Sequence, residues 1–145
     1  NNVLGVIDFF TPHLNPPPAV AGGGREGGEV LFLNANGYVT EASVWNIFAV
    51  KEKGLFTPQT GILHGVTRKF VIECAQKENL PVIETNLTRH DIWNAEEAFL
   101  TNTSGEIAPI RSLDGRTIGT VVPGLITKRL TNRFHKELKK ELEKT

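Results

Sequence analysis

Residues 30–57 are patterned as short strands separated by turn residues. Their runs are apolar or alternate between apolar and polar positions, which is typical of strands that face a core. Strands are predicted at residues 30–33, 38–40, 46–50 and 55–57. Asn36 and Gly37 supply the first turn, because this pair readily takes positive φ. Turns at a spacing of about ten residues predict a meander over this region.

Two later stretches have the spacing of amphipathic helices. A helix is predicted over residues 66–78, with Pro81 as a stop signal just beyond it. Its apolar face is expected to contain Val66, Phe70, Val71, Cys74 and Ala75. A last helix begins after the Pro-Gly pair at 123–124, with an apolar face in steps of four: Ile126, Leu130, Phe134, Leu138 and Leu142. We interpret the Lys and Arg residues on its other faces as a solvated surface rather than a nucleic-acid site.

Between these helices the pattern returns to strands. Strands are predicted at residues 81–87, 98–101 and 107–113. Pro109 cannot donate to a strand ladder, so the last of them is predicted to lie at an edge or to contain a bulge. Thr88 followed by Asp91 is similar to a capping box and predicts a short helix through Asn94.

The N-terminal part has a different composition. Residues 3–10 are apolar and fit either a strand or a short helix, and three consecutive prolines at 16–18 then require an extended backbone. The glycines at 22–24 and 27–28 are typical of a linker, since they match neither the Walker nor the dinucleotide pattern. We therefore predict an N-terminal segment or linker over 1–28 and a domain over 29–145.

Composition places the chain among ordinary globular proteins. It has 145 residues, enough for one domain with a core, and 39% of them are hydrophobic. Lys plus Arg and Asp plus Glu number 16 each, so nucleic-acid binding is not implied. No apolar run approaches about 18 residues and no signal peptide is recognised, so no membrane association is predicted. The single cysteine, Cys74, excludes a disulfide framework, and we expect a cytoplasmic or organellar protein.

Three polar features suggest a ligand site. Gly65 precedes the helix predicted from Val66, and the unpaired N–H groups of a helix start attract anions, phosphate above all. Glu41 ends a predicted strand, and residues 103–105 form a hydroxyl-rich turn. Together they suit an anionic, heteroaromatic ligand. The alternative is that Thr67 and Thr103 are ordinary cap and turn residues and that Glu41 is a surface charge.

From about Glu29 to its end, the chain resembles the class IV pyridoxal-phosphate aminotransferases, which include branched-chain and D-amino-acid aminotransferases and aminodeoxychorismate lyase. The resemblance rests on residues 36–41 (NGYVTE), 46–48 (NIF), 55–58 (LFTP), 63–68 (LHGVTR), 97–101 (EAFLT), 110–115 (IRSLDG), Gly119 and 123–130 (PGLITKRL). The last two blocks look most like the branched-chain members. The resemblance implies an α/β (α+β) fold with a mixed, barrel-like sheet and flanking helices, as in the C-terminal of the family's two domains.

The resemblance also assigns roles to particular residues. Glu41 would hold the pyridine nitrogen of pyridoxal 5'-phosphate, and Leu63 would pack against the ring. Val66, Thr67 and Thr103 would hold the phosphate. Ser104 and Gly105, in the same turn as Thr103, would offer backbone N–H groups to the substrate carboxylate. The family more often has Ala-Ala or Thr-Ser at these last two positions.

No residue of the chain is assigned to the Schiff base. Counting back from Glu41, the family's lysine falls on residues 7–9, where there is none, and the first lysine is Lys51. In a second register, residues 2–4 resemble the segment just after that lysine, which then lies upstream. The family's N-terminal domain is absent as well. We therefore expect a C-terminal, cofactor-holding part of a longer protein, inactive by itself.

Three functions stay open at this point. The first is amino-group transfer between a branched-chain type of amino acid and a 2-oxo acid, by a homo-oligomer that is a dimer or larger. The second is a D-amino-acid aminotransferase or an aminodeoxychorismate lyase on the same scaffold. The third is a non-catalytic domain that keeps the fold and a phosphate-ester site.

Overall fold

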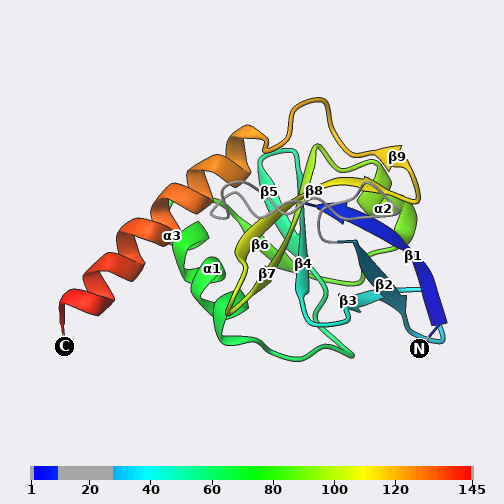
Figure 1. The fold of residues 1–145 in the computed structure, drawn as a ribbon, viewed down its shortest axis with the longest axis horizontal. Coiled ribbons are helices and arrows are strands. Elements are labelled where there is room, and N and C mark those ends of the chain that lie inside the picture. Colours follow the sequence, from blue (N-terminus) through cyan, green and yellow to red (C-terminus); the bar gives the residue numbers. More distant parts are fainter. Residues whose placement is uncertain (1, 10–27, 145) are drawn as a thin grey trace.

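A computed structural model describes residues 2–9 and 28–144, and all structural statements below refer to these residues. The described chain contains nine strands and three helices in one mixed α/β arrangement (Figure 1). The strands are β1 (Asn2–Phe9), β2 (Glu29–Leu33), β3 (Val39–Ala42), β4 (Asn46–Lys51), β5 (Gly54–Thr57), β6 (Val82–Glu84), β7 (Glu97–Asn102), β8 (Glu106–Leu113) and β9 (Arg116–Thr117). The helices are α1 (Val66–Lys77), α2 (Arg89–Trp93) and α3 (Leu125–Glu143).

The sheet is mixed, as expected, but it does not close. Its order is β3-β2-β1-β8-β7-β4-β5-β6, with β9 paired to β8. The β5–β6 pair is parallel and the other named pairs are antiparallel. β3 and β6 end the order and do not pair with each other, and a single bridge from Tyr38 to Thr88 links the chain beside them. Within the described strands the sheet is therefore strongly curled, and no closed barrel is found.

The predicted strands at 30–33, 38–40, 46–50 and 55–57 all form, but the expected meander is wrong. Among the described residues β3 and β4 form no ladder, and an isolated bridge joins Ala42 of β3 to Trp45 just before β4. β4 pairs instead with β5 and β7. Five consecutive residues of β4 are buried, so this strand needs cover on both faces and takes a central place. Sequence-local turn signals could not show a partner that lies about 50 residues further along the chain.

Pro109 lies in β8, in the middle of the sheet order. It pairs with Phe99 of β7, whereas the described pairing with β1 begins at Ile110, next to a register shift opposite Asp8 and Phe9. In the part of the chain that the structure describes, Pro109 has a ladder partner on one side only, close to that register shift. The edge alternative is therefore wrong, because β8 pairs with strands on both sides, and the nearby irregularity agrees with the bulge alternative.

The N-terminal region contributes a strand to this sheet. Residues 2–9 form β1, which lies between β2 and β8, and Ile7 and Phe9 are buried in the core. The strand alternative for residues 3–10 is thus the observed one. The Pro- and Gly-rich residues 10–27 lie outside the described residues, and the domain boundary at residue 28 stays a prediction.

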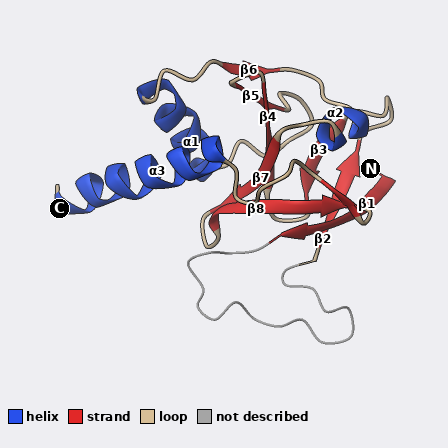
Figure 2. Cartoon of the chain, turned by 90° about the horizontal axis from the view of Figure 1, so that it is seen from above, coloured by secondary structure: helices blue, strands red, loops and turns tan. Residues whose placement is uncertain are grey.

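α1 and α3 pack together at one end of the sheet, while α2 lies at the other (Figure 2). Val71, Cys74 and Ala75 of α1 are buried with Leu130 and Phe134 of α3, as their spacing predicts. Two residues of the predicted apolar faces are exposed. Val66 is 82% exposed because α1 begins beside a cavity, and Leu142 is 67% exposed because α3 extends past the sheet (Figure 1).

Ion pairs join α1 and α3. Glu137 of α3 is 7% exposed and lies 2.8 Å from Lys77 Nζ and 3.1 Å from Arg133 Nη1. The hydrogen bond from Lys77 is the main cause that lowers the pKa of Glu137 to about 2. Burial raises the pKa of the Cys74 thiol to about 11, so this cysteine is chemically inert at neutral pH. None of the described helices is long and apolar enough to cross a membrane.

Candidate functional site

The residues predicted to bind the cofactor lie around one cavity of about 290 Å³. It opens between the end of β3, the start of β4, the start of α1 and the end of β7. The lining residues are Glu41, Ser43, Val44, Trp45, Asn46, Leu63, Gly65, Val66, Thr67, Thr101, Asn102 and Thr103. The structure thus brings together Glu41, Leu63, Val66, Thr67 and Thr103, which come from three separate segments of the sequence.

The carboxylate of Glu41 has a fixed partner. The backbone N–H of Leu63 donates to Glu41 Oε1 over 2.7 Å, so one carboxylate oxygen is held and the other remains available. The side chain of Leu63 is 74% exposed at the same cavity, with Val44 and Val66 also exposed beside it. An exposed apolar rim around a polar interior is typical of a ligand or interface site.

The start of α1 forms another wall. Gly65 is the N-cap and no side chain caps this end, while the first turn contains no acidic residue. The positive end of the helix dipole and its unpaired N–H groups therefore face the cavity, where Gly65, Val66 and Thr67 line it. Thr67 is 9% exposed, so burial restricts its side-chain rotamers. This wall suits a phosphate group.

Arg68 fixes that first turn from behind. The side chain is 5% exposed, and its Nη2 donates to Pro58 O over 3.1 Å and to Glu84 Oε1 over 2.6 Å. These contacts connect α1 to β6 and to the loop after β5. The basic residue at the start of α1 is therefore directed away from the cavity and into the structure.

The cavity floor is a cross-strand pair. Asn46 of β4 and Thr101 of β7 are opposite each other in register, and both line the cavity. Asn46 Nδ2 donates to Leu63 O over 2.8 Å. Thr101 is 1% exposed, and its hydroxyl finds no hydrogen-bond partner in the described chain. An unsatisfied buried hydroxyl costs about 1–3 kcal/mol, which a polar ligand in the cavity would recover.

The turn after β7 differs from the expectation. Thr103 lines the cavity, whereas Ser104 and Gly105 do not. The N–H of Gly105 donates to Asn102 Oδ1 over 2.5 Å, so it is not free for a substrate carboxylate. A Cβ at Gly105 would overlap the indole of Trp45, so the glycine lets this ring pack beneath the turn. The aromatic ring and the small residue occupy complementary space.

Sequence reasoning missed several of these residues as site residues: Asn46, Thr101, Trp45 and Asn102. Asn46 and Thr101 were assigned only to strands. The available signal was a polar residue next to a strongly apolar run in each strand, because such a residue is buried only when it has a partner or a ligand. No lysine lines this cavity, and the described residues contain no group of acidic, His or Cys residues that could hold a metal ion.

The sequence and the geometry agree with a known family. A sequence model described as amino-transferase class IV matches residues 23–113, more than half of the chain. The chain belongs to the class IV aminotransferases. The match spans β2 to β8 and therefore contains every wall of the cavity.

Curated relatives support the same membership. The chain is 37% identical over 117 residues to a branched-chain-amino-acid aminotransferase of Pseudomonas aeruginosa, covering 80% of this chain and 37% of that protein. It is 34% identical over 115 residues to a D-alanine aminotransferase of Bacillus licheniformis, covering 78% of this chain and 41% of that protein. The chain thus spans about 40% of the length of these relatives.

Solved structures show the same fold. The branched-chain amino acid aminotransferase of Escherichia coli superposes with a TM-score of 0.73 at 37% identity, over 74% of this chain and 37% of that one. A putative 4-amino-4-deoxychorismate lyase from Legionella pneumophila gives 0.71 at 33% identity, over 76% and 41%. A branched-chain amino acid aminotransferase solved with pyridoxamine 5'-phosphate gives 0.71 at 32% identity, over 74% and 36%.

Proposed function

We propose that this class IV aminotransferase chain holds pyridoxal 5'-phosphate in the cavity and takes part in amino-group transfer between an amino acid of the branched-chain type and a 2-oxo acid. The observation that carries the proposal is the meeting of a carboxylate, an uncapped helix start and two threonines around one cavity. Family membership supports the same reading, as does the related structure solved with pyridoxamine 5'-phosphate.

The residues present fit this cofactor. The phosphate would lie at the start of α1, where the backbone N–H groups of Val66 and Thr67 and the hydroxyls of Thr67 and Thr103 can donate. The unpartnered hydroxyl of Thr101 on the floor is a further donor. At the opposite wall, Glu41 would accept a hydrogen bond from the pyridine nitrogen, and Leu63 would cover the ring.

Each of these residues has a separate chemical task. The bound cofactor supplies an electron sink for the pair left when an amino acid loses its α-proton. Glu41 keeps the proton on the ring nitrogen, because an opposite charge at hydrogen-bond distance raises the pKa of that nitrogen. The α1 start and the threonines would orient the phosphate, and the exposed apolar rim of Val44, Leu63 and Val66 would lie against the bound ring and limit its contact with water. The lysine that the chemistry requires is not among the cavity residues.

A direct test uses pyridoxamine 5'-phosphate, which binds without a lysine because it has no aldehyde. We expect calorimetric titration of the 145-residue chain to show one site per chain. Pyridoxamine and inorganic phosphate, each carrying half of the recognised groups, are expected to bind far more weakly. Equal binding of phosphate and pyridoxamine 5'-phosphate would mean that the cavity recognises an anion and not the cofactor.

The reaction itself has two alternatives on this scaffold. D-Amino-acid transfer is favoured by the similarity to D-alanine aminotransferase, and a lyase reaction by the similarity to the putative aminodeoxychorismate lyase. We favour the branched-chain type because the blocks at 110–115 and 123–130 resemble those members most. Product assays on a longer, lysine-bearing protein that contains this chain, with branched-chain L-amino acids, D-alanine and aminodeoxychorismate, separate the three reactions. Sedimentation of the same sample tests the homo-oligomer that the resemblance implies.

A further inference from the structure

We propose that Asn46 is the positioning residue of this cavity and sets the two opposed walls, Glu41 and the start of α1, in register with each other. The proposal rests on the proposed function, because register between these walls matters only if one ligand spans both. Asn46 does not need to touch that ligand. It acts through Leu63 on one side and through Gly65 on the other.

The first link runs from Asn46 to Glu41. Asn46 Nδ2 donates to Leu63 O over 2.8 Å, and Leu63 N–H donates to Glu41 Oε1 over 2.7 Å. Both polar backbone groups of Leu63 are thus held by side chains from two different strands. Asn46 fixes the Leu63 backbone, and Leu63 in turn fixes the direction of the carboxylate.

The second link runs from Asn46 to the start of α1. Gly65 is the N-cap of this helix, and its N–H donates to the same Leu63 O over 3.0 Å. Asn46 Oδ1 lies so close to Gly65 that a Cβ there would be 2.6 Å from it. The carboxamide therefore contacts the glycine directly and limits how far the helix start can move toward the floor.

Asn46 itself is rigid enough for this role. It is 6% exposed at the start of β4 and is paired with Thr101 of β7. The sheet therefore holds its backbone, and burial restricts its side-chain rotamers. The loop between β5 and α1, in contrast, exposes Gly61, Leu63 and His64, and the hydrogen bonds of the Leu63 backbone connect it to Asn46 and Glu41.

The experiment uses two variants that reach the same contact from opposite sides. Asn46→Ala removes the carboxamide, and Gly65→Ala places a methyl group where the Asn46 oxygen lies. The φ of Gly65 is −65°, so alanine fits its backbone without strain. Each variant of the 145-residue chain is titrated with pyridoxamine 5'-phosphate, for affinity and for the pH at which the bound ring nitrogen loses its proton.

A matched control is available on the same strands. Thr57 is fully buried, and its Oγ1 donates to Ile47 O over 2.7 Å, one residue along β4 from Asn46. Thr57→Val removes a buried side-chain-to-backbone hydrogen bond of similar length without touching the cavity lining. It is expected to lower the melting temperature but to leave unchanged both the affinity and the pH at which the bound ring nitrogen loses its proton.

We expect Asn46→Ala to weaken binding by about 10-fold and to lower the deprotonation pH of the bound ring by about one unit, toward that of the free ligand. Gly65→Ala is expected to do the same. In the double variant the methyl group meets no carboxamide, so binding should be no weaker than in Asn46→Ala alone.

The outcomes separate the inference from the function on which it rests. If the unaltered chain does not bind pyridoxamine 5'-phosphate, the proposed function fails and the inference falls with it. If the unaltered chain binds while Asn46→Ala keeps the same affinity, the same deprotonation pH of the bound ring and a native circular dichroism spectrum, only the inference is wrong. If Gly65→Ala lowers the affinity as much in the Asn46→Ala variant as in the unaltered chain, the methyl group blocks the ligand directly. The coupling through Asn46 is then also refuted.

Discussion

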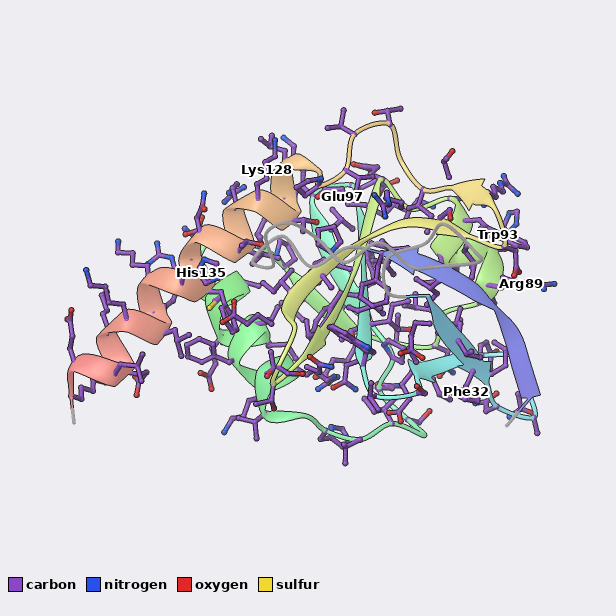
Figure 3. All side chains as sticks on the ribbon, in the orientation of Figure 1. Phe32, Arg89, Trp93, Glu97, Lys128 and His135 are labelled. Atoms are coloured by element: carbon purple, nitrogen blue, oxygen red, sulfur yellow. The ribbon has the colours of Figure 1, made fainter. Side chains whose placement is uncertain are left out.

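The two long helices, α1 and α3, have similar sequences at their starts, but these starts lie in different surroundings. α1 and α3 both start after a glycine that supplies no side-chain cap, and neither has an acidic residue in its first turn. At α3, Glu97 of β7 accepts hydrogen bonds from the N–H groups of Ile126 and Thr127 and from the Thr127 hydroxyl, at 3.0, 2.7 and 2.7 Å. Figure 3 shows Glu97 beside the start of this helix, near Lys128.

At α1 the corresponding space is a cavity. The carboxylate that lines this cavity, Glu41, accepts a hydrogen bond from Leu63 N–H and not from the helix start. A helix start favours a negative charge in both cases; at α3 the fold supplies that charge internally, whereas at α1 we propose that a ligand supplies it. In this fold, a helix that starts after a glycine is free to hold an external anion only where no strand delivers a carboxylate to its start.

Removing the internal carboxylate should have the largest effect on stability. Glu97→Ala leaves three donors at the α3 start without their charged acceptor, and we expect the free energy of unfolding to fall by about 2–4 kcal/mol. That corresponds to a melting temperature lower by about 5–15 °C. Glu96→Ala is the control: its carboxylate accepts one exposed bond, from Glu52 N, and should cost less than about 1 kcal/mol.

Thr67 in the first turn of α1 and Thr127 in the first turn of α3 should affect different properties, ligand affinity and stability respectively. Thr67→Ala, and likewise Thr103→Ala, should weaken binding of pyridoxamine 5'-phosphate by about 10- to 150-fold with little loss of stability, because a charge-assisted hydrogen bond to phosphate is worth about 1.5–3 kcal/mol. Thr127→Ala should lower stability and leave binding unchanged. Calorimetry and thermal melts on the same samples decide this, and a Thr67 variant with unaltered affinity would place the phosphate elsewhere.

The sequence located the helix start and the carboxylate but not their surroundings. The spacing of apolar residues predicted α1, and Thr88 with Asp91 predicted the capping box of α2. Each of these signals is formed by residues that are close to one another in the sequence. The cap that Glu97 supplies to α3 joins residues about 30 positions apart, and no local signal reports it. The hydrogen bond from Gly105 N–H to Asn102 is different, because these residues lie only three positions apart and an Asn in a turn is a local signal that the sequence analysis did not use.

The family resemblance extended the site prediction further than periodicity could. It named Glu41, Leu63 and Thr103 as partners although they are far apart in the chain, and the fold places them around one cavity. It did not name Thr101, whose relevance comes from a hydroxyl without a partner in the described structure. Such a feature depends on every neighbouring atom and is visible only once the packing is known.

The smallest expected effect concerns that hydroxyl. Thr101→Val removes an unsatisfied buried polar group, so the unliganded chain should be as stable as before or more stable by up to about 1 kcal/mol. Affinity for pyridoxamine 5'-phosphate should fall about 3- to 10-fold, because valine cannot donate the hydrogen bond that the Thr101 hydroxyl would give to the ligand. A large loss of stability without ligand would show that Thr101 already has a partner inside the protein.

The most direct test of the contrast between the two helix starts places one carboxylate at each. Val66 and Leu125 are the first residues of α1 and α3, and both are exposed, at 82% and 73%. Val66→Glu should weaken binding of pyridoxamine 5'-phosphate by at least about 30-fold, because the new charge faces the phosphate, while Leu125→Glu should leave the affinity unchanged. Equal affinities for both variants and the unaltered chain would contradict the assignment of the α1 start as the phosphate site.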